Sequence, residues 1–245
     1  MLKKITLIAM TVLLGACAQV PPEKEDPRDP LQSINRPIYD FNMDVLDAYI
    51  LRPVAVGYVK ITPAPVRSSI VNFTDNIDAP IDAANAALQG KMDRTGVALA
   101  RFLVNSTVGI AGLFDVATSL GLESVDEDFG QTLGVWGVGD GAYVMLPGMG
   151  PSTARNLTGD VVDNFVLPEI ALTTPQTILV FALRVVETRA SLIPQESLLN
   201  ESLDPYTFVK DIYYQRQLYE VYDGNPPLQE EPEAQEYDDD FLENL

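Results

Sequence analysis

The sequence contains no histidine and a single cysteine, Cys17. The absence of histidine excludes Ser-His-Asp and Cys-His catalysis and most zinc sites. A single cysteine cannot form an internal disulfide, so packing must hold the fold together. The sequence also lacks the Gly-x-Ser-x-Gly motif of a nucleophile elbow and the glycine-rich motif of a phosphate-binding loop. These absences argue against an enzyme and leave no predicted metal or cofactor.

Basic residues are scarce as well. The chain has 16 Lys and Arg against 35 Asp and Glu, which gives a formal net charge of −19 at pH 7. Nucleic acid is therefore not an expected partner, because its phosphates require clustered basic side chains. Electrostatic attraction to anionic lipids is disfavoured for the same reason. Any membrane contact of the folded chain must be made through apolar surface.

The apolar run at the N-terminus, residues 5–14, is about ten residues long, which is too short to span a bilayer. Lys3 and Lys4 precede this run, and Leu14-Gly15-Ala16-Cys17 follows it. This order predicts a lipoprotein signal peptide over residues 1–16. Cys17 then becomes the lipid-bearing first residue of the mature protein. Removal of residues 1–16 takes away both lysines and lowers the formal net charge from −19 to −21.

Residues 17–28 are predicted to be a lipidated, flexible tether, because residues 18–28 are polar and rich in proline. Ala18 stands where enteric bacteria place the Asp of an inner-membrane retention signal. Because this Asp is missing, sorting to the outer membrane is favoured. One acyl chain gives only marginal membrane binding, whereas two or more give stable anchoring. The expected protein is membrane-anchored through Cys17 and needs no transmembrane helix.

Residues 29–225 have the pattern of a single all-α domain built from short helices that prolines interrupt. Apolar residues recur at spacings of three and four, which indicates helices with one apolar face. Helix starts are predicted at Asp29-Pro30, Pro53, Pro80, Pro151, Thr174-Pro175 and Asp204-Pro205. The helix that begins at Pro80 is expected to end at Leu88, before Gly90. Residues 226–245, with eight acids and no base, predict a disordered acidic tail.

Two segments have an unusual composition. Residues 130–150 combine seven glycines with apolar and aromatic side chains, which predicts a flexible, amphipathic hairpin or a looped pair of short helices. Residues 178–186 are apolar nearly all round, which indicates burial or lipid contact. The acidic run Asp126-Glu127-Asp128 lacks a calcium-loop pattern and predicts a solvated turn.

Several short strings occur in a characteristic order over residues 29–217. In the first half they are Asp29-Pro30-Leu31, Asn35-Arg36, Phe41-Asn42, Arg52-Pro53-Val54-Ala55, Asn72-Phe73 and Leu88-Gln89-Gly90. In the second half they are Arg101-Phe102, Asn105-Ser106-Thr107, Asp115-Val116-Ala117, Phe129-Gly130-Gln131-Thr132-Leu133-Gly134, Gly137-Val138-Gly139, Leu146-Pro147, Asp204-Pro205-Tyr206 and Gln215-Arg216. With this order and spacing the chain resembles the MlaA family, also called VacJ.

The resemblance implies an outer-membrane lipoprotein of intermembrane phospholipid transport. Its fold is expected to be a helical ring lying in the inner, periplasmic leaflet beside a trimeric porin. Mislocalised phospholipids would leave the outer leaflet through a central amphipathic channel and pass to a periplasmic lipid-carrier protein. This activity would maintain outer-membrane lipid asymmetry. The channel or gate candidates are Gly134, Gly137, Gly139, Gly141 and Tyr143.

Four polar residues are candidates for handling lipid. Asn35, Arg36 and Asn42 lie at helix-like spacings, so they face either the pore or neighbouring elements. Arg155 lies near a predicted helix start, where it contacts either a lipid phosphate or a structural acid. Two other functions stay open: a structural lipoprotein that scaffolds a porin or an assembly complex, and a lipase that works through carboxylates.

Overall fold

A computed structural model describes residues 26–165 and 172–227. The predicted signal peptide, Cys17, most of the tether and the acidic tail from residue 228 lie outside the described residues. The helical elements are α2 (Gln32–Asp40), η2 (Phe41–Leu51), α3 (Arg52–Ile61), α4 (Ala64–Leu88), α5 (Met92–Thr107), α6 (Val116–Ser119), α7 (Phe129–Val135), α8 (Ala154–Phe165), α9 (Thr174–Leu192), η3 (Ile193–Gln195), α10 (Glu196–Asn200) and α11 (Pro205–Val221). Two strands, β1 (Tyr143–Leu146) and β2 (Gly150–Thr153), form an antiparallel hairpin.

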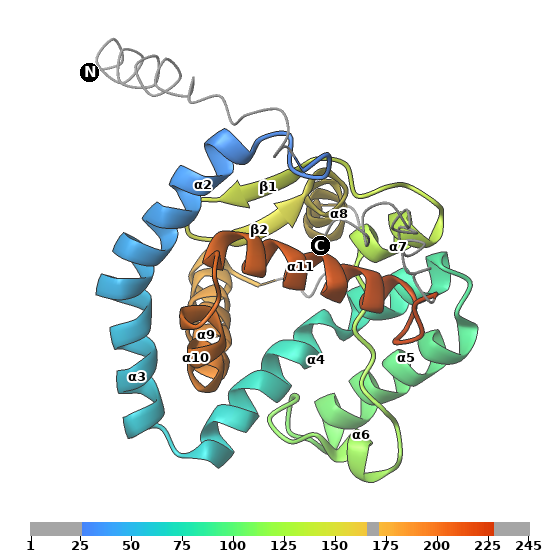
Figure 1. Cartoon of the computed structure of the whole chain (residues 1–245). Helices are drawn as coiled ribbons and strands as arrows, with labels where there is room; N and C mark the ends of the chain where they lie inside the picture. The colour runs from blue at the N-terminus through green and yellow to red at the C-terminus, as the bar shows by residue number, and fades with distance from the viewer. Residues whose placement is uncertain (1–25, 166–171, 228–245) are drawn as a thin grey trace, which may run out of the picture.

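The helices of the first half follow an arc around the molecule (Figure 1). α2, η2 and α3 run on from one another, and α4 then turns across the molecule to meet α5, which packs along it. α9 contacts both α3 and α4, and α11 crosses the middle of the view to reach β2 and α7. The all-α prediction is confirmed, with the small hairpin as the one sheet in the described residues.

The buried apolar side chains form two small clusters. The first joins Tyr39 of α2, Tyr143 and Met145 of β1, and Tyr206 of α11. Its rings meet edge to face, as between Tyr39 and Tyr206 with centroids 5.6 Å apart. The second joins α4, α5 and the segment after α6 through Ala83, Ala98 and Val125. Elsewhere in the described ranges, buried apolar residues are mostly alanines, so the helices share no large common core.

Pro80 does not begin a helix, contrary to the prediction. α4 runs unbroken from Ala64 to Leu88 and holds Pro80 in its interior. An interior proline removes one backbone hydrogen bond and crowds the preceding turn. Packing of α5 and α7 along this part of α4 outweighs that local cost. The predicted end is confirmed, because Gly90 adopts a φ of +79° just after the helix.

Two further predictions from sequence are wrong. Pro151 lies in β2, opposite Met145, and the next helix begins only at Ala154. Met145 directs its N–H away from β2, so the missing N–H of Pro151 leaves no unpaired group there. The run from residue 126 to 128 is not a solvated turn, since Glu127 is 1% exposed. Lys91 and Arg94, at the start of α5, reach its carboxylate at 3.2 and 2.8 Å and allow its burial.

Large apolar side chains are exposed along several helices. Near the start of α9, Ile178, Leu179 and Phe181 are 63%, 59% and 55% exposed. Others are Phe41, Val45, Tyr49, Val54 and Ile61 on η2 and α3, and Leu99, Leu103, Val108, Ile110 and Phe114 on and after α5. Exposed apolar side chains that gather on one surface mark contact with a membrane or with another protein. Within the described ranges, no helix combines the length and apolar character needed to cross a bilayer.

Candidate functional site

The free edge of β1 is held by two asparagine side chains from the arc. Asn35 donates to Tyr143 O at 3.0 Å and accepts from Met145 N at 2.9 Å. Asn42 donates to Leu146 O at 2.9 Å and accepts from Gly148 N at 2.8 Å. Each amide therefore pairs with the strand as a neighbouring backbone would. The structure thus assigns to Asn35 and Asn42 the docking of the hairpin onto α2 and η2.

The two candidate arginines form structural ion pairs. Arg36 binds Asp204 and stacks over Tyr206, with the guanidinium carbon 4.5 Å from the ring centroid. The Arg36 guanidinium holds the pKa of Asp204 well below its usual range. Arg155 binds Asp140 at 2.7 Å and donates to Val138 O at 3.3 Å. Arg155 therefore holds the loop between α7 and β1.

The gate candidates occupy different environments. A side chain at Gly134 would meet Val221 of α11 at 2.7 Å and Arg155 at 3.2 Å, so this glycine permits close packing. Gly137 and Gly139 face open space, and Gly141, with a φ of +70°, packs on Ala154. Tyr143 is fully buried in the first apolar cluster. Of the five candidates, Gly137 and Gly139 are thus the ones with open space beside them.

Two polar cavities lie along α4. The first, of about 250 Å³, is lined by α4, α5 and the segment from residue 115 to 125 and is partly open to solvent. The second, of about 260 Å³, lies between α4 and α9. Asn72 lines both cavities, so they adjoin along the same helix face. The face continues at spacings of three and four residues, and its polar members are Arg67, Ser68, Asn72, Asp75, Asn76 and Asp82.

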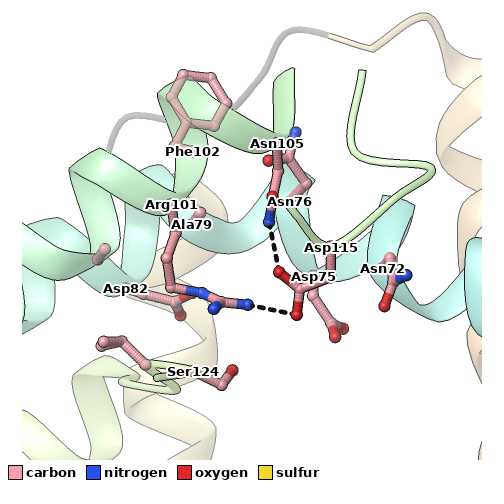
Figure 2. A pocket seen from close by; sticks show the side chains of 12 residues that line it. Asn72, Asp75, Asn76, Ala79, Asp82, Arg101, Phe102, Asn105, Asp115 and Ser124 are labelled. Atoms are coloured by element: carbon pink, nitrogen blue, oxygen red, sulfur yellow. Dashed lines mark hydrogen bonds and ion pairs between the residues drawn. The ribbon is translucent and has the colours of Figure 1, made fainter. Parts of the chain in front are cut away.

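The wall of the first cavity is rigid on the α5 side. Arg101 binds Asp115 at 3.1 Å, and Asn105 donates to the other oxygen of that carboxylate at 3.1 Å (Figure 2). Arg101 also donates to the Thr118 hydroxyl at 2.9 Å. Burial would raise the pKa of Asp115, but its hydrogen bonds with Thr118 and Arg101 lower it to about 2. Asp115 is therefore ionised at neutral pH and fully engaged.

The acids on the α4 side are less easily ionised. Burial, together with the neighbouring Asp126, raises the pKa of Asp82 to about 9. Burial raises the pKa of Asp75 to about 6, and Asp78 adds to the rise. Burial is the larger cause of both shifts, and the neighbouring carboxylates add to them because each disfavours the charge of the next.

The polar face of α4 was not among the sites predicted from sequence. The sequence does contain the pattern of this face, because polar residues recur at spacings of three and four beside the apolar stripe of Val66, Ile70, Phe73 and Ile77. A polar helix face normally faces water, so the pattern alone does not predict a binding site. The positions of α5 and α9, which enclose this stripe, are set by contacts between distant parts of the chain.

This fold and site define a class of helical protein with an enclosed polar helix face, exposed apolar helices and a docked glycine-rich hairpin. The model of the MlaA lipoprotein family matches residues 27–220. The chain is 39% identical over 234 residues to the intermembrane phospholipid transport system lipoprotein MlaA of Escherichia coli, covering 94% of this chain and 93% of that protein. It is 31% identical over 226 residues to the protein of the same name from Haemophilus influenzae, covering 90% of each.

A solved structure is similar as well. That structure, described as the structural basis for maintenance of bacterial outer membrane lipid asymmetry, shares 41% identity and a TM-score of 0.73. The match covers 80% of this chain and 99% of that chain. The chain belongs to the MlaA lipoprotein family, as the sequence resemblance predicts.

Proposed function

We propose that this chain is an outer-membrane lipoprotein that removes mislocalised phospholipids from the outer leaflet. The lipid would cross an amphipathic passage and be handed to a periplasmic carrier, so that lipid asymmetry is maintained. The names of the relatives and the subject of the similar solved structure support the general role. The proposed activity breaks no covalent bond, and the protein is therefore not an enzyme.

The observation that carries this proposal is the pair of adjoining polar cavities along α4 beside helices with exposed apolar side chains. Moving a phospholipid across a membrane is costly because its charged headgroup must leave water. The adjoining cavities at Asn72 offer polar groups to a headgroup. Leu99 and Leu103 on α5, and Ile178 and Phe181 on α9, offer apolar surface to the acyl chains. Both halves of the lipid therefore find matching surface on neighbouring helices.

The docked hairpin and its loop are the proposed gate. Asn35 and Asn42 hold β1, and Arg155 holds the preceding loop at Val138 and Asp140, on either side of Gly139. Glycine gives this loop backbone freedom between fixed points. This arrangement supports movement of the loop backbone at Gly137 and Gly139 while β1 stays docked through Asn35 and Asn42.

A bulky residue at Gly139 tests the gate. Its side chain would enter open space, so Gly139→Phe should leave the fold intact. Gly96→Phe on α5 is the matched control, because Gly96 also has open space beside it. In a deletion strain, the control should restore normal outer-leaflet phospholipid and detergent resistance, and Gly139→Phe should not.

The same experiment separates transport from scaffolding. A scaffold for a porin would tolerate Gly139→Phe and would still co-purify with the porin. A deletion strain with normal outer-leaflet phospholipid would contradict the transport proposal altogether. The porin and the carrier are partners that the family resemblance suggests, and co-purification of the full-length lipoprotein tests both.

The anchor at Cys17 is part of the proposal. Cys17→Ala should leave the signal peptide uncleaved and prevent sorting, which the intact mass and membrane fractionation would show. If a soluble periplasmic form restored lipid asymmetry fully, the lipid anchor would not be required.

A further inference from the structure

The first cavity contains a buried acceptor with no partner. Asn76 is 7% exposed and lines the cavity, and its Oδ1 atom makes no hydrogen bond within the described structure. Its Nδ2 atom is committed, since it donates to the Ser106 hydroxyl at 2.9 Å. The loop after α5 fixes the side chain, because Gly112 packs directly on it with a φ of +88°. A buried carbonyl oxygen without a donor costs free energy that a ligand N–H would recover.

A carboxylate, that of Asp75, lines the same cavity and can offer its charge to a ligand. Asp75 is exposed, so its carboxylate is open to a ligand. Arg101 is the only basic residue among the described residues that line the cavity, and its contacts with Asp115 and Thr118 occupy it. The cavity therefore offers a carboxylate and a carbonyl oxygen to a ligand but no free cation.

We propose that the first cavity is a headgroup subsite for phospholipids that carry a primary ammonium, such as phosphatidylethanolamine. The ammonium would donate to the Asp75 carboxylate and to Asn76 Oδ1. The glycerol headgroup of phosphatidylglycerol carries no ammonium to pair with Asp75, so the net negative charge of that lipid would stay unbalanced beside this carboxylate. This inference rests on the proposed function and names the lipid class that the site prefers.

The size and surroundings of the cavity fit a headgroup. At about 250 Å³ it is smaller than the ~300–1,000 Å³ of pockets that enclose whole drug-sized ligands, so the acyl chains must stay outside. Exposed Leu103 and Phe114 lie on α5 and on the loop that leads to Asp115, next to the cavity wall. The amide of Asn72, where the two cavities adjoin, is placed to donate to the lipid phosphate.

Lipid competition tests this assignment. The purified, full-length lipoprotein is mixed with excess phosphatidylethanolamine and phosphatidylglycerol of identical acyl chains in equal amounts, repurified, and its bound lipid measured by mass spectrometry. We expect phosphatidylethanolamine to be enriched about tenfold over the input, because one charged hydrogen bond contributes about that factor. Phosphatidylcholine, which has no N–H to donate to Asn76, should compete more weakly than phosphatidylethanolamine.

Variants of Asp75 locate the preference. Asp75→Asn should bring the bound ratio close to the input, and Asp75→Lys should reverse it. Asp93→Asn is the matched control, since Asp93 is an exposed acid on α5 that lines neither cavity. Its ratio should equal that of the unchanged protein.

The inference is overturned if the unchanged protein binds both lipids at the input ratio, or if Asp75→Asn keeps the preference. In either case lipid is still bound, so the proposed transport function stands. If the protein and all variants retain no lipid, the proposed function fails, and the subsite fails with it.

Discussion

Removal of the Asn35 side chain should undock the hairpin from the arc. Asn35 is 1% exposed and makes hydrogen bonds with Asp29 at 2.8 Å, Tyr143 O at 3.0 Å and Met145 N at 2.9 Å. In Asn35→Ala two buried backbone groups of β1, the carbonyl of Tyr143 and the N–H of Met145, lose their hydrogen-bond partner. Asp29 keeps the contacts of its Oδ2 atom with the Tyr206 hydroxyl and Lys210, but its Oδ1 atom loses its donor as well.

The expected loss of stability follows from those three orphaned groups. A buried donor or acceptor that loses its partner costs about 1–3 kcal/mol, so Asn35→Ala should lower the free energy of unfolding by about 3 kcal/mol. That is a large fraction of the roughly 5–15 kcal/mol that stabilises a typical domain. Asn35→Asp should be at least as damaging, because it keeps the acceptor for Met145 but sets a second carboxylate against Asp29.

Denaturant unfolding in detergent micelles measures the loss. The fluorescence of Trp136, the only tryptophan, reports the contact of α7 with α4 through its hydrogen bond with Leu88 O. Hydrogen exchange at the Met145 amide should accelerate in Asn35→Ala more than exchange within α5. The matched control is Asn164→Ala, which removes an exposed amide that bonds only within α8 and should change stability by less than about 0.5 kcal/mol. Unchanged protection of the Met145 amide in Asn35→Ala would refute the docking role.

Three further predictions concern α4, α8 and α9. Asp82→Asn should raise the free energy of unfolding at pH 8 by several kcal/mol, and denaturant unfolding at a series of pH values should show this gain vanish as the pH falls toward 4. The reason is that the folded pKa of about 9 lies above the ordinary 3.8, so that ionisation of Asp82 disfavours the fold as the pH rises between these two values. Gly159→Ala should destabilise by about 1–3 kcal/mol in denaturant unfolding, since its Cβ would lie 2.3 Å from Gly130 N, whereas Gly96→Ala, in open helix, should stabilise by about 0.5–1 kcal/mol. In a form that lacks residues 1–17, and hence both signal peptide and anchor, Ile178→Asp should reduce flotation with phosphatidylcholine vesicles while Thr177→Asp should not. Equal flotation of the two variants would contradict lipid contact of α9.

The sequence predicts most helices well because their boundaries are local. Thr173 and Gln176 form the capping box that starts α9, and Asp204 caps the first turn of α11. Pro80 failed as a local signal, since tertiary packing carries α4 past it. The roles of Asn35 and Asn42 were also hidden, because their partners lie more than 100 residues away in the chain. Long-range pairing of this kind leaves no periodic trace in the sequence.

The enclosed polar face also explains where the stability of this fold resides. A helix that lines a polar cavity cannot contribute that face to an apolar core, and both apolar clusters are correspondingly small. Buried hydrogen bonds between side chains join the helices instead. Asn85 of α4 donates to Asp163 of α8 at 2.8 Å and accepts from Thr132 of α7 at 3.0 Å.

Those bonds stabilise only while every partner is present, because each lost partner leaves another buried group unsatisfied. Asn85→Ala should therefore separate α4 from both α7 and α8 and destabilise the chain more than a single lost hydrogen bond, of about 1 kcal/mol, would suggest. A double-mutant cycle with Thr132→Val in denaturant unfolding measures this coupling. Additive effects of the two substitutions would show that the apolar clusters, small as they are, hold these helices together without the network.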